Sequence, residues 1–291
     1  MNPHPTLITT LAELRETVAT ARRRGQRIGL VPTMGALHDG HLSLVRASQA
    51  ECGLTVVSIY VNPTQFGPQE DFSRYPRVLD ADLERLATCG SPVVVFAPAD
   101  REMYPEGFAT WVEVTSVSRP LEGECRPSHF RGVTTVVLKL FNMVLPDVAF
   151  FGQKDYQQVA VIRQMVRDLN LPLTVRMCPT VREADGLALS SRNRYLDPAA
   201  RRDALVLWKS LQRADELICA GQRNAKIIAE QMREVISTAQ NATIDYLALV
   251  DPQTLEAVAE IRGPVLAALA VRIGGTRLID NRLLEEKGSP S

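Results

Sequence analysis

Residues 1–181 alternate short apolar runs with amphipathic segments, and this alternation restricts the possible folds more than any other feature. The apolar runs are rich in β-branched residues, as is typical of buried parallel strands. They lie at residues 27–31, 54–61, 92–97, 148–151 and 173–178. Helix-like segments separate most of them. This order predicts an α/β fold, a Rossmann-like doubly wound parallel sheet that binds ligands at the carboxyl ends of its strands.

The pattern changes after Val181. An Asp197–Pro198 pair is typical of a helix start, and a long predicted helix follows it. A second helix and three strand-like runs come next, and the last two runs form a predicted hairpin across Gly274 and Gly275. We therefore predict a Rossmann-like catalytic domain over residues 1–181 and a smaller α+β domain over residues 182–291.

The overall composition argues against several classes of protein. Lysine plus arginine equals aspartate plus glutamate, at 33 residues each, so the chain lacks the basic footprint of a nucleic-acid-binding protein. The five cysteines are scattered, which argues against a disulfide framework or a cysteine-based zinc site. The N-terminus has no secretory pattern, and no apolar stretch is long enough to span a membrane. We expect a cytoplasmic protein with neither nucleic-acid nor membrane partners.

A histidine pair follows the first apolar run, in the segment PTMGALHDGHLSLV at residues 32–45. A turn at Gly35 precedes His38 and His41, and an apolar helix-like stretch comes after them. A helix N-terminus carries roughly half a positive charge and presents outward-pointing N–H groups, so it attracts anions. Histidines three residues apart lie on one helix face and can contact the same phosphate. The segment predicts a nucleotide triphosphate site, although alone it fits a glycine turn with two structural histidines equally well.

Three further segments carry polar groups where strands are expected to end. Asn62 and Gln65 follow one strand, and their amides can orient the hydroxyls and carboxylate of a small substrate. Lys154 opens a helix after Gly152, where a phosphate can approach the backbone, although the chain has no Walker motif. The segment LSSRNR at residues 189–194 offers hydroxyls and arginines to a triphosphate. Each segment alone also fits a surface loop or a helix cap, but the four together on one α/β scaffold favour a shared site.

These four segments resemble the pantothenate synthetase (pantoate–β-alanine ligase) family of the H-x-G-H nucleotidyltransferase superfamily. The resemblance runs over nearly the whole chain, through TMGALHDGH, VNPTQF, HFRGV, FGQKDYQQ and LSSRNRYL. It implies a ligase that joins (R)-pantoate to β-alanine with ATP, through an enzyme-bound pantoyl adenylate, and that releases AMP and pyrophosphate. It also implies a homodimer and a C-terminal domain that acts as a lid.

The resemblance also implies roles for individual residues. The implied catalytic residues are His38, His41, Lys154 and Arg192. The family treats the histidine at the position of His41 as a proton donor, whereas the negative charge that develops on the transferring adenylyl group favours charge stabilisation, and both roles stay open. Gln65 and Gln158 are the implied pantoate ligands, with Gln65 near the β-alanine position, and further pocket positions are Asn62, Tyr75, Arg126 and His129. The implied ATP contacts are Met34, Gly35, Ala36, Leu37, His38, Asp39, Gly40, His41, Gly152, Gln153, Lys154, Asp155, Val181, Leu189, Ser190, Ser191 and Arg192.

Magnesium is expected to accompany ATP, held mostly by phosphate oxygens and water. Asp80 and Asp82 are candidate protein ligands of this ion, and a solvated helix N-terminus explains both acids equally well. We expect no organic cofactor.

Three other functions stay open on the sequence alone. A nucleotidylyltransferase would transfer AMP to a substrate and stop there. A zinc hydrolase would use His38, His41 and His129 as metal ligands, although the glycines around the first two favour phosphate. A nucleotide-binding module without catalysis is the third alternative.

Overall fold

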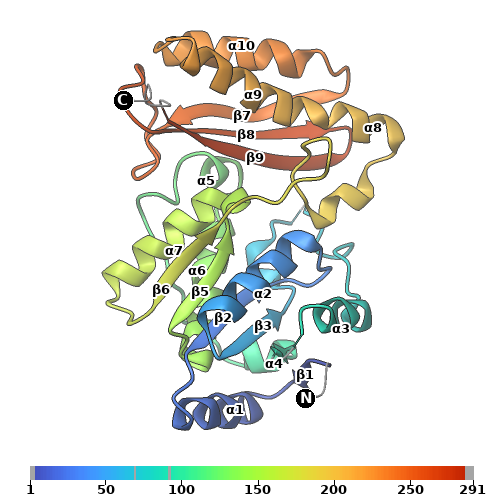
Figure 1. Cartoon of the computed structure of the whole chain (residues 1–291), viewed down its shortest axis with the longest axis vertical. Helices are drawn as coiled ribbons and strands as arrows, with labels where there is room; N and C mark the ends of the chain where they lie inside the picture. The colour runs from blue at the N-terminus through green and yellow to red at the C-terminus, as the bar shows by residue number, and fades with distance from the viewer. Residues whose placement is uncertain (1–3, 69, 91–92, 286–291) are drawn as a thin grey trace. The chain divides into compact units, whose positions relative to one another are not determined.

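The computed structural model describes residues 4–68, 70–90 and 93–285, which form two compact units (Figure 1). Unit 1 comprises the described part of residues 1–153 together with residues 157–179. Unit 2 comprises residues 154–156 and the described part of residues 180–291. The segment Lys154–Tyr156 therefore belongs to unit 2 although unit 1 flanks it in the chain. Within the described ranges, no helix is both long enough and apolar enough to cross a membrane.

Unit 1 is built on a six-stranded sheet with the strand order β1-β4-β3-β2-β5-β6, and neighbouring strands are parallel. The strands are β1 (Thr6–Ile8), β2 (Ile28–Thr33), β3 (Leu54–Ile59), β4 (Val93–Phe96), β5 (Val148–Gly152) and β6 (Thr174–Cys178). The central strands are almost entirely buried, which explains their continuous apolar runs. The predicted Rossmann-like doubly wound parallel sheet is confirmed.

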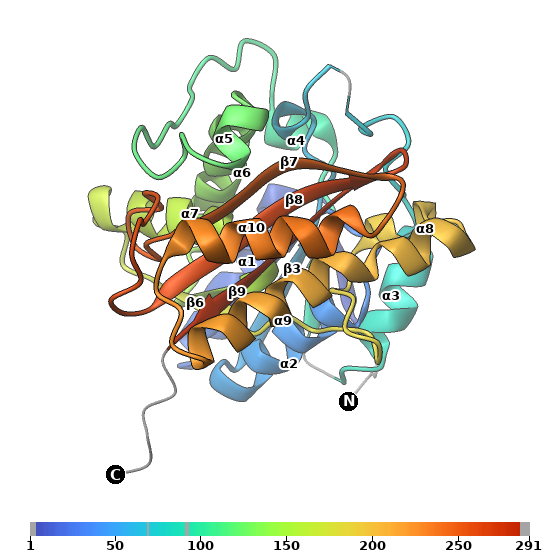
Figure 2. The ribbon, with the colours of Figure 1, turned by 90° about the horizontal axis from the view of Figure 1, so that it is seen from above.

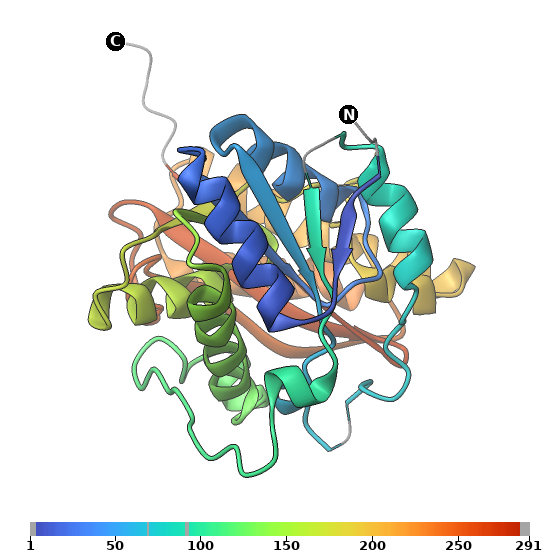
Figure 3. The ribbon, with the colours of Figure 1, turned by 90° about the horizontal axis from the view of Figure 1, so that it is seen from below.

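Helices cover both faces of this sheet. Helices α1 (Leu11–Arg23) and α6 (His129–Val144) lie side by side on one face (Figure 3). Helices α2 (Asp39–Glu51) and α3 (Leu79–Ala87) pack on the other face, where Val45 and Leu86 join a buried core with Val31 and Phe150. The other helices of the segments that form this unit are α4 (Asp100–Met103), α5 (Glu122–Cys125) and α7 (Tyr156–Asp168).

The strand order reverses between β2 and β5. From β2 the sheet extends through β3, β4 and β1 in one direction, and through β5 and β6 in the other. Doubly wound sheets bind their ligands at the carboxyl ends of the strands, beside such a reversal. The histidine segment follows β2 and the Gly152 segment ends β5, so both predicted motifs begin at this point.

Unit 2 is an α+β unit with a three-stranded antiparallel sheet, in the order β7-β8-β9. The strands are β7 (Ala242–Val250), β8 (Val265–Ile273) and β9 (Thr276–Leu284). Helices α9 (Leu205–Cys219) and α10 (Ala225–Ser237) lie side by side against the sheet and share one core with it (Figure 2). The predicted hairpin across Gly274 and Gly275 is present between β8 and β9.

The structure has two helices where the sequence predicted one long helix after Asp197. The Asp197 carboxylate caps α8 (Pro198–Asp203), and α9 begins two residues after α8 ends. The chain tightens at Ala204, whose carbonyl accepts from the N–H of Leu207 only three residues later. The short strand β1 was not predicted, and the predicted strand over residues 92–97 begins at Pro92, which lies outside the described residues.

Candidate active site

The histidine segment forms a tight turn between β2 and α2. Gly35 and Ala36 have left-handed backbone conformations, with φ of 79° and 50°. The backbone N–H of His38 donates to Nδ1 of His41 at 3.3 Å, and the two imidazole rings stack with centroids 4.0 Å apart. Because Nδ1 of His41 accepts this bond, the ring proton of a neutral His41 lies on Nε2. Nε2 is therefore a hydrogen-bond donor, as a phosphate contact requires.

Gln65 lies beside this turn. It ends a short 3-10 helix, η1 (Pro63–Gln65), that follows β3, and its Nε2 contacts Sδ of Met34 at 3.1 Å. Asn62 donates to Oε1 of Gln65 at 3.1 Å and to the carbonyl of Gly132 at 3.2 Å. The structure thus brings two of the predicted segments together. It also orients the Gln65 amide, with its oxygen toward Asn62 and its nitrogen toward Met34.

Two further predicted pocket residues, Asn62 and Tyr75, are buried. The side-chain oxygen of Asn62 accepts from the hydroxyl of Tyr104 at 2.8 Å and from that of Thr64 at 3.0 Å. The Tyr75 ring packs edge-on against Phe66, with centroids 5.9 Å apart. Both ends of the Asn62 amide therefore have protein partners, which makes Asn62 a support for Gln65.

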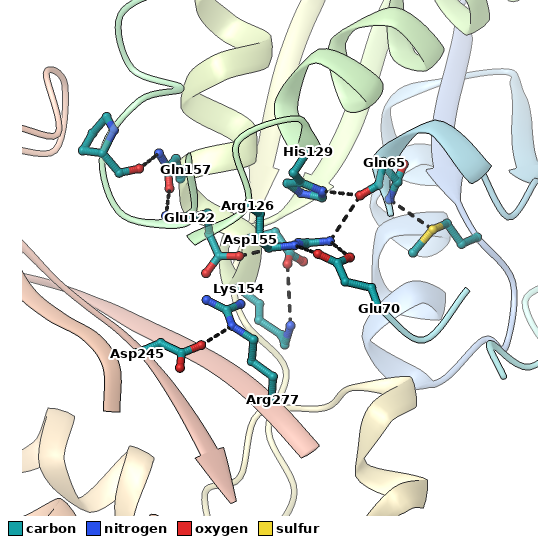
Figure 4. A network of polar contacts seen from close by, with 12 residues as sticks. Gln65, Glu70, Glu122, Arg126, His129, Lys154, Asp155, Gln157, Asp245 and Arg277 are labelled. Carbon is teal, nitrogen blue, oxygen red and sulfur yellow. Dashed lines mark hydrogen bonds and ion pairs between the residues drawn. The ribbon is translucent and has the colours of Figure 1, made fainter. Parts of the chain in front are cut away.

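Arg126 and His129 both contact the main chain of Gln65 (Figure 4). Nδ1 of His129 lies 2.9 Å from the Gln65 carbonyl, and an Arg126 nitrogen donates to the same carbonyl at 3.3 Å. A carbonyl oxygen only accepts, so the His129 ring donates from Nδ1. Arg126 also forms ion pairs with Glu70 at 2.6 Å and with Glu122 at 3.5 Å. These contacts fix the backbone of Gln65, while Asn62 fixes its side chain.

Burial and charge set the ionisation of this cluster. Burial, together with the nearby Arg126 charge, lowers the pKa of His129 to about 4. Burial raises the pKa of the Glu70 carboxyl, but the hydrogen bond and the charge of Arg126 outweigh it, and that pKa lies below its ordinary value. At neutral pH the cluster therefore holds an uncharged histidine beside a charged arginine–glutamate pair.

Gly132 in α6 allows the close approach of η1. A Cβ atom there would overlap the carbonyl oxygen of Thr64 and lie 2.7 Å from Cα of Gln65, and neither backbone atom can rotate away. Gly132→Ala is expected to displace Gln65 and to destabilise unit 1 by about 1–3 kcal/mol, the usual cost of overpacking. Helix propensity alone would stabilise the variant by up to about 1 kcal/mol. The sign of the change in unfolding free energy therefore distinguishes overpacking from helix propensity.

Urea unfolding of the Gly132→Ala variant measures this effect. Gly263→Ala is the matched control, because a Cβ atom at Gly263 meets nothing within 4 Å. An unchanged or increased stability for Gly132→Ala would contradict the close packing of α6 on η1.

The carboxyl end of β5 presents an open backbone. Gly152 ends the strand, and a Cβ atom there would meet nothing within 4 Å, so a group can approach the main chain closely.

Two neighbouring glutamines at the start of α7 differ in burial and in hydrogen bonding. Gln158, a predicted substrate ligand, is partly buried, whereas Gln157 is buried and donates to the carbonyls of Val117 and Pro120. Gln157 therefore holds the loop before α5.

Lys154 and Asp155 lie in the 3-10 helix η2 (Gln153–Asp155) and belong to unit 2. Their side chains form an ion pair at 3.6 Å. Asn281 on β9 donates to the carbonyl of Lys154 at 2.7 Å. This hydrogen bond fixes the main chain from which the lysine extends.

The loop that carries Ser190, Ser191 and Arg192 also lies in unit 2. The N–H of Leu189 donates to the carbonyl of Val181 at 3.0 Å, so these two predicted ATP residues lie side by side. Ser190 caps η3 (Ser191–Tyr195) by accepting from the N–H of Arg192 at 3.3 Å. The structure thus groups these predicted residues in one loop held by main-chain hydrogen bonds.

Asp82, a predicted magnesium ligand, is a buried residue in the first turn of α3. Its Oδ2 accepts from the N–H of Ala36 at 2.9 Å, and its Oδ1 accepts from the N–H of Leu37 at 2.7 Å. In the part of the chain that the structure describes, no group of three or more His, Cys, Asp or Glu side chains could hold a metal ion. The surroundings of Asp82 do not fit a magnesium site.

Three residues that support the predicted site had no indication in the sequence. Tyr104 supports Asn62, Glu70 pairs with Arg126, and Asn281 holds Lys154. Their partners lie 42, 56 and 127 residues away in the chain, beyond any local pattern. The four-residue spacing of Glu122 and Arg126 was a local signal for an ion pair, which the structure contains.

The sequence comparisons identify one family over nearly the full length. The family model for pantoate-beta-alanine ligase matches residues 6–283. The pantothenate synthetase of Moorella thermoacetica is 56% identical over 279 residues, which cover 96% of this chain and 98% of that protein. The pantothenate synthetase of Acetivibrio thermocellus is 55% identical, with coverage of 96% and 99%.

Solved structures agree with this result. The pantothenate synthetase of Thermus thermophilus superimposes with a TM-score of 0.91 at 45% identity, over 95% of this chain and 98% of that one. The pantoate-beta-alanine ligase of Francisella tularensis, solved with beta-gamma ATP and beta-alanine, gives a TM-score of 0.79 at 33% identity, with coverage of 96% and 97%. Since the family model, the curated relatives and the solved structures all span both units, the chain belongs to the pantoate–β-alanine ligase family.

Proposed function

We propose that this chain condenses (R)-pantoate with β-alanine to give pantothenate, AMP and pyrophosphate, through a pantoyl adenylate. The observation that carries the proposal is the 3.1 Å contact between Nε2 of Gln65 and Sδ of Met34. It joins an amide suited to a small polar acid to the turn that precedes the histidine pair. Ligands of doubly wound sheets bind at this edge. The Francisella relative was solved with beta-gamma ATP and beta-alanine, which supports the same assignment.

In the first step, a pantoate carboxylate oxygen attacks the α-phosphorus of ATP, and pyrophosphate leaves with the electrons of the broken P–O bond. The carboxylate is ionised at neutral pH, so the step needs no general base. It needs positive charge and hydrogen-bond donors, because two anions approach each other and charge develops on the phosphate oxygens. The proposed donors are His38, His41, Lys154 and Arg192.

In the second step, the amine of β-alanine attacks the acyl carbon of the adenylate, AMP leaves, and the new ammonium group loses a proton. Orientation of the amine contributes strongly to such a step, because a positioned reactant avoids the entropy cost of encounter. We assign Gln65 and Gln158 to pantoate, with Gln65 next to β-alanine. Asn62, Tyr75, Arg126 and His129 then shape this pocket by holding Gln65 and its loop.

The proposed ATP contacts are residues 34–41, 152–155, 189–192 and Val181. A catalytic domain of residues 1–181 and a lid domain of residues 182–291 form part of the same proposal. We further propose that Mg²⁺ enters with ATP, held by phosphate oxygens and water, that the enzyme needs no organic cofactor, and that it acts in the cytoplasm as a homodimer. Sedimentation of the purified chain tests the oligomeric state.

The decisive experiment is a product assay with the purified chain. ATP plus pantoate is expected to release pyrophosphate, and β-alanine is expected to convert the reaction to AMP and pantothenate. A nucleotidylyltransferase would not respond to β-alanine, and a nucleotide-binding module would bind ATP without releasing AMP. Metal analysis of the purified chain tests the zinc hydrolase alternative. Absence of pantoate-stimulated pyrophosphate release would refute the proposed function.

A further inference from the structure

Asp82 joins the start of α3 to the turn before the histidine pair. Its two carboxylate oxygens accept from the consecutive N–H groups of Ala36 and Leu37, at 2.9 and 2.7 Å. These partners precede Asp82 by 46 and 45 residues. Asp82 is only 1% exposed, so its charge is offset by the protein and not by solvent. The contact is therefore a fixed part of the fold.

The turn at residues 35–37 has the geometry that binds anions. Successive backbone N–H groups in a left-handed turn converge on one point and attract negative charge. Here the Asp82 carboxylate already occupies that point. A Cβ atom at Gly35 would lie 2.9 Å from Oδ2 of Asp82 and 3.0 Å from Cγ2 of Ile59, so the acid and the turn pack in direct contact. An external phosphate must therefore bind further along the segment, at the histidines and the start of α2.

We propose that Asp82 is a positioning residue that sets the direction of α2 and thereby the placement of His38 and His41 on the triphosphate. The inference rests on the proposed function, because it assigns the histidines to ATP. His38 directly follows the anchored Leu37, and its N–H orients the His41 ring. Release of the turn would thus move both imidazoles together.

The same contacts argue against Asp82 as a magnesium ligand. Magnesium takes oxygen ligands at about 2.1 Å in near-octahedral geometry and usually keeps several waters. Both Asp82 oxygens accept backbone N–H bonds, and at 1% exposure the side chain has almost no surface for a hydrated ion.

The first test uses the wild-type chain without ligands and measures hydrogen exchange at the amides of Ala36 and Leu37. Both amides are expected to be protected to the level of the neighbouring strand, and addition of ATP is expected to leave that protection unchanged. Fast exchange that slows only when ATP is added would overturn the proposal. This readout needs no turnover, so it is independent of the product assay for the proposed function.

The second test is the Asp82→Asn variant, which keeps the side-chain shape but places an NH2 group against a backbone N–H. Pyrophosphate release from ATP and pantoate is expected to slow by about 10²-fold, as expected when catalytic groups move by about 1 Å. The Mg²⁺ concentration for half-maximal activity is expected to stay unchanged. Asp80→Asn is the matched control, because Asp80 lies in the same helical turn and is less buried than Asp82.

The outcomes of this second test are distinct. A large increase in the Mg²⁺ requirement, with activity restored by high Mg²⁺, would identify Asp82 as a metal ligand and overturn the positioning role. Wild-type turnover in Asp82→Asn would also overturn the positioning role. If Asp82→Asn fails to fold, Asp82→Glu serves in its place, and the exchange experiment on the wild type still decides the question.

Discussion

Replacement of His41 by alanine is expected to slow pantoate-dependent pyrophosphate release by about 10²–10³-fold, which corresponds to about 2.7–4 kcal/mol of transition-state stabilisation. The structure gives the reason. The His38 N–H occupies Nδ1 of His41, so the imidazole donates through Nε2, and the variant removes that donor. The geometry of the bound carboxylate and ATP would remain, so KM for pantoate is expected to change little.

A second substitution distinguishes charge stabilisation from proton transfer by His41. The amide of His41→Gln keeps an N–H donor but cannot release a proton at neutral pH. Substantial recovery of activity relative to His41→Ala would support hydrogen-bond donation, and no recovery would support proton transfer. His4→Ala is the control for a generic histidine effect, because His4 is exposed near the N-terminus. Wild-type turnover in His41→Ala would refute any role in catalysis.

Acidification from pH 7 to pH 4 is expected to destabilise unit 1 by about 3 kcal/mol through His129 alone. The pKa of this imidazole is 6.5 in its unperturbed state and about 4 in the fold, because burial and the Arg126 charge oppose its protonation. The unfolded chain therefore binds the proton more readily. Stability is fully present above the unperturbed pKa and is lost as the pH falls toward the folded value, at about 1.36 kcal/mol per pH unit.

Tryptophan fluorescence can measure this loss within one unit. The chain has two tryptophans, Trp111 in unit 1 and Trp208 in unit 2, so Trp208→Phe leaves a reporter for unit 1. His129→Gln in that background keeps a donor for the Gln65 carbonyl and removes the titration. The wild-type side chain is expected to show the steeper fall in urea midpoint between pH 6.5 and about 4. Parallel curves for the two variants would contradict a neutral, buried His129.

Much of the fold was predictable because buried parallel strands leave continuous apolar runs in the sequence. The strands around the reversal point, β2, β3 and β5, fall within about two residues of their predicted positions. Strand β1 has three residues and exists through its pairing with β4, so no local period could indicate it. The break between α8 and α9 at buried Ala204 was also missed, because alanine has the highest helix propensity.

The candidate site was predictable in its segments but not in its connections. Glycine and histidine spacing located the turn after β2, and the position of Gln65 after a strand predicted its closeness to that turn. The role of Asp82 was not visible, since an acid early in a helix suits solvent, metal and backbone equally well. Only the tertiary fold brings its carboxylate to two amides more than forty residues away.

The discontinuous chain of unit 2 has a consequence for gene recombination between relatives. A crossover at residue 180 would take Lys154–Tyr156 from one parent and the rest of unit 2 from the other. Hydrogen bonds between described residues join these parts: Asn281 donates to the Lys154 carbonyl, and the Tyr156 hydroxyl donates to the Pro252 carbonyl at 3.2 Å. Both acceptors are main-chain atoms, which every sequence supplies. Chimaeras should therefore keep these hydrogen bonds wherever one parent contributes Tyr156 and the other contributes Asn281.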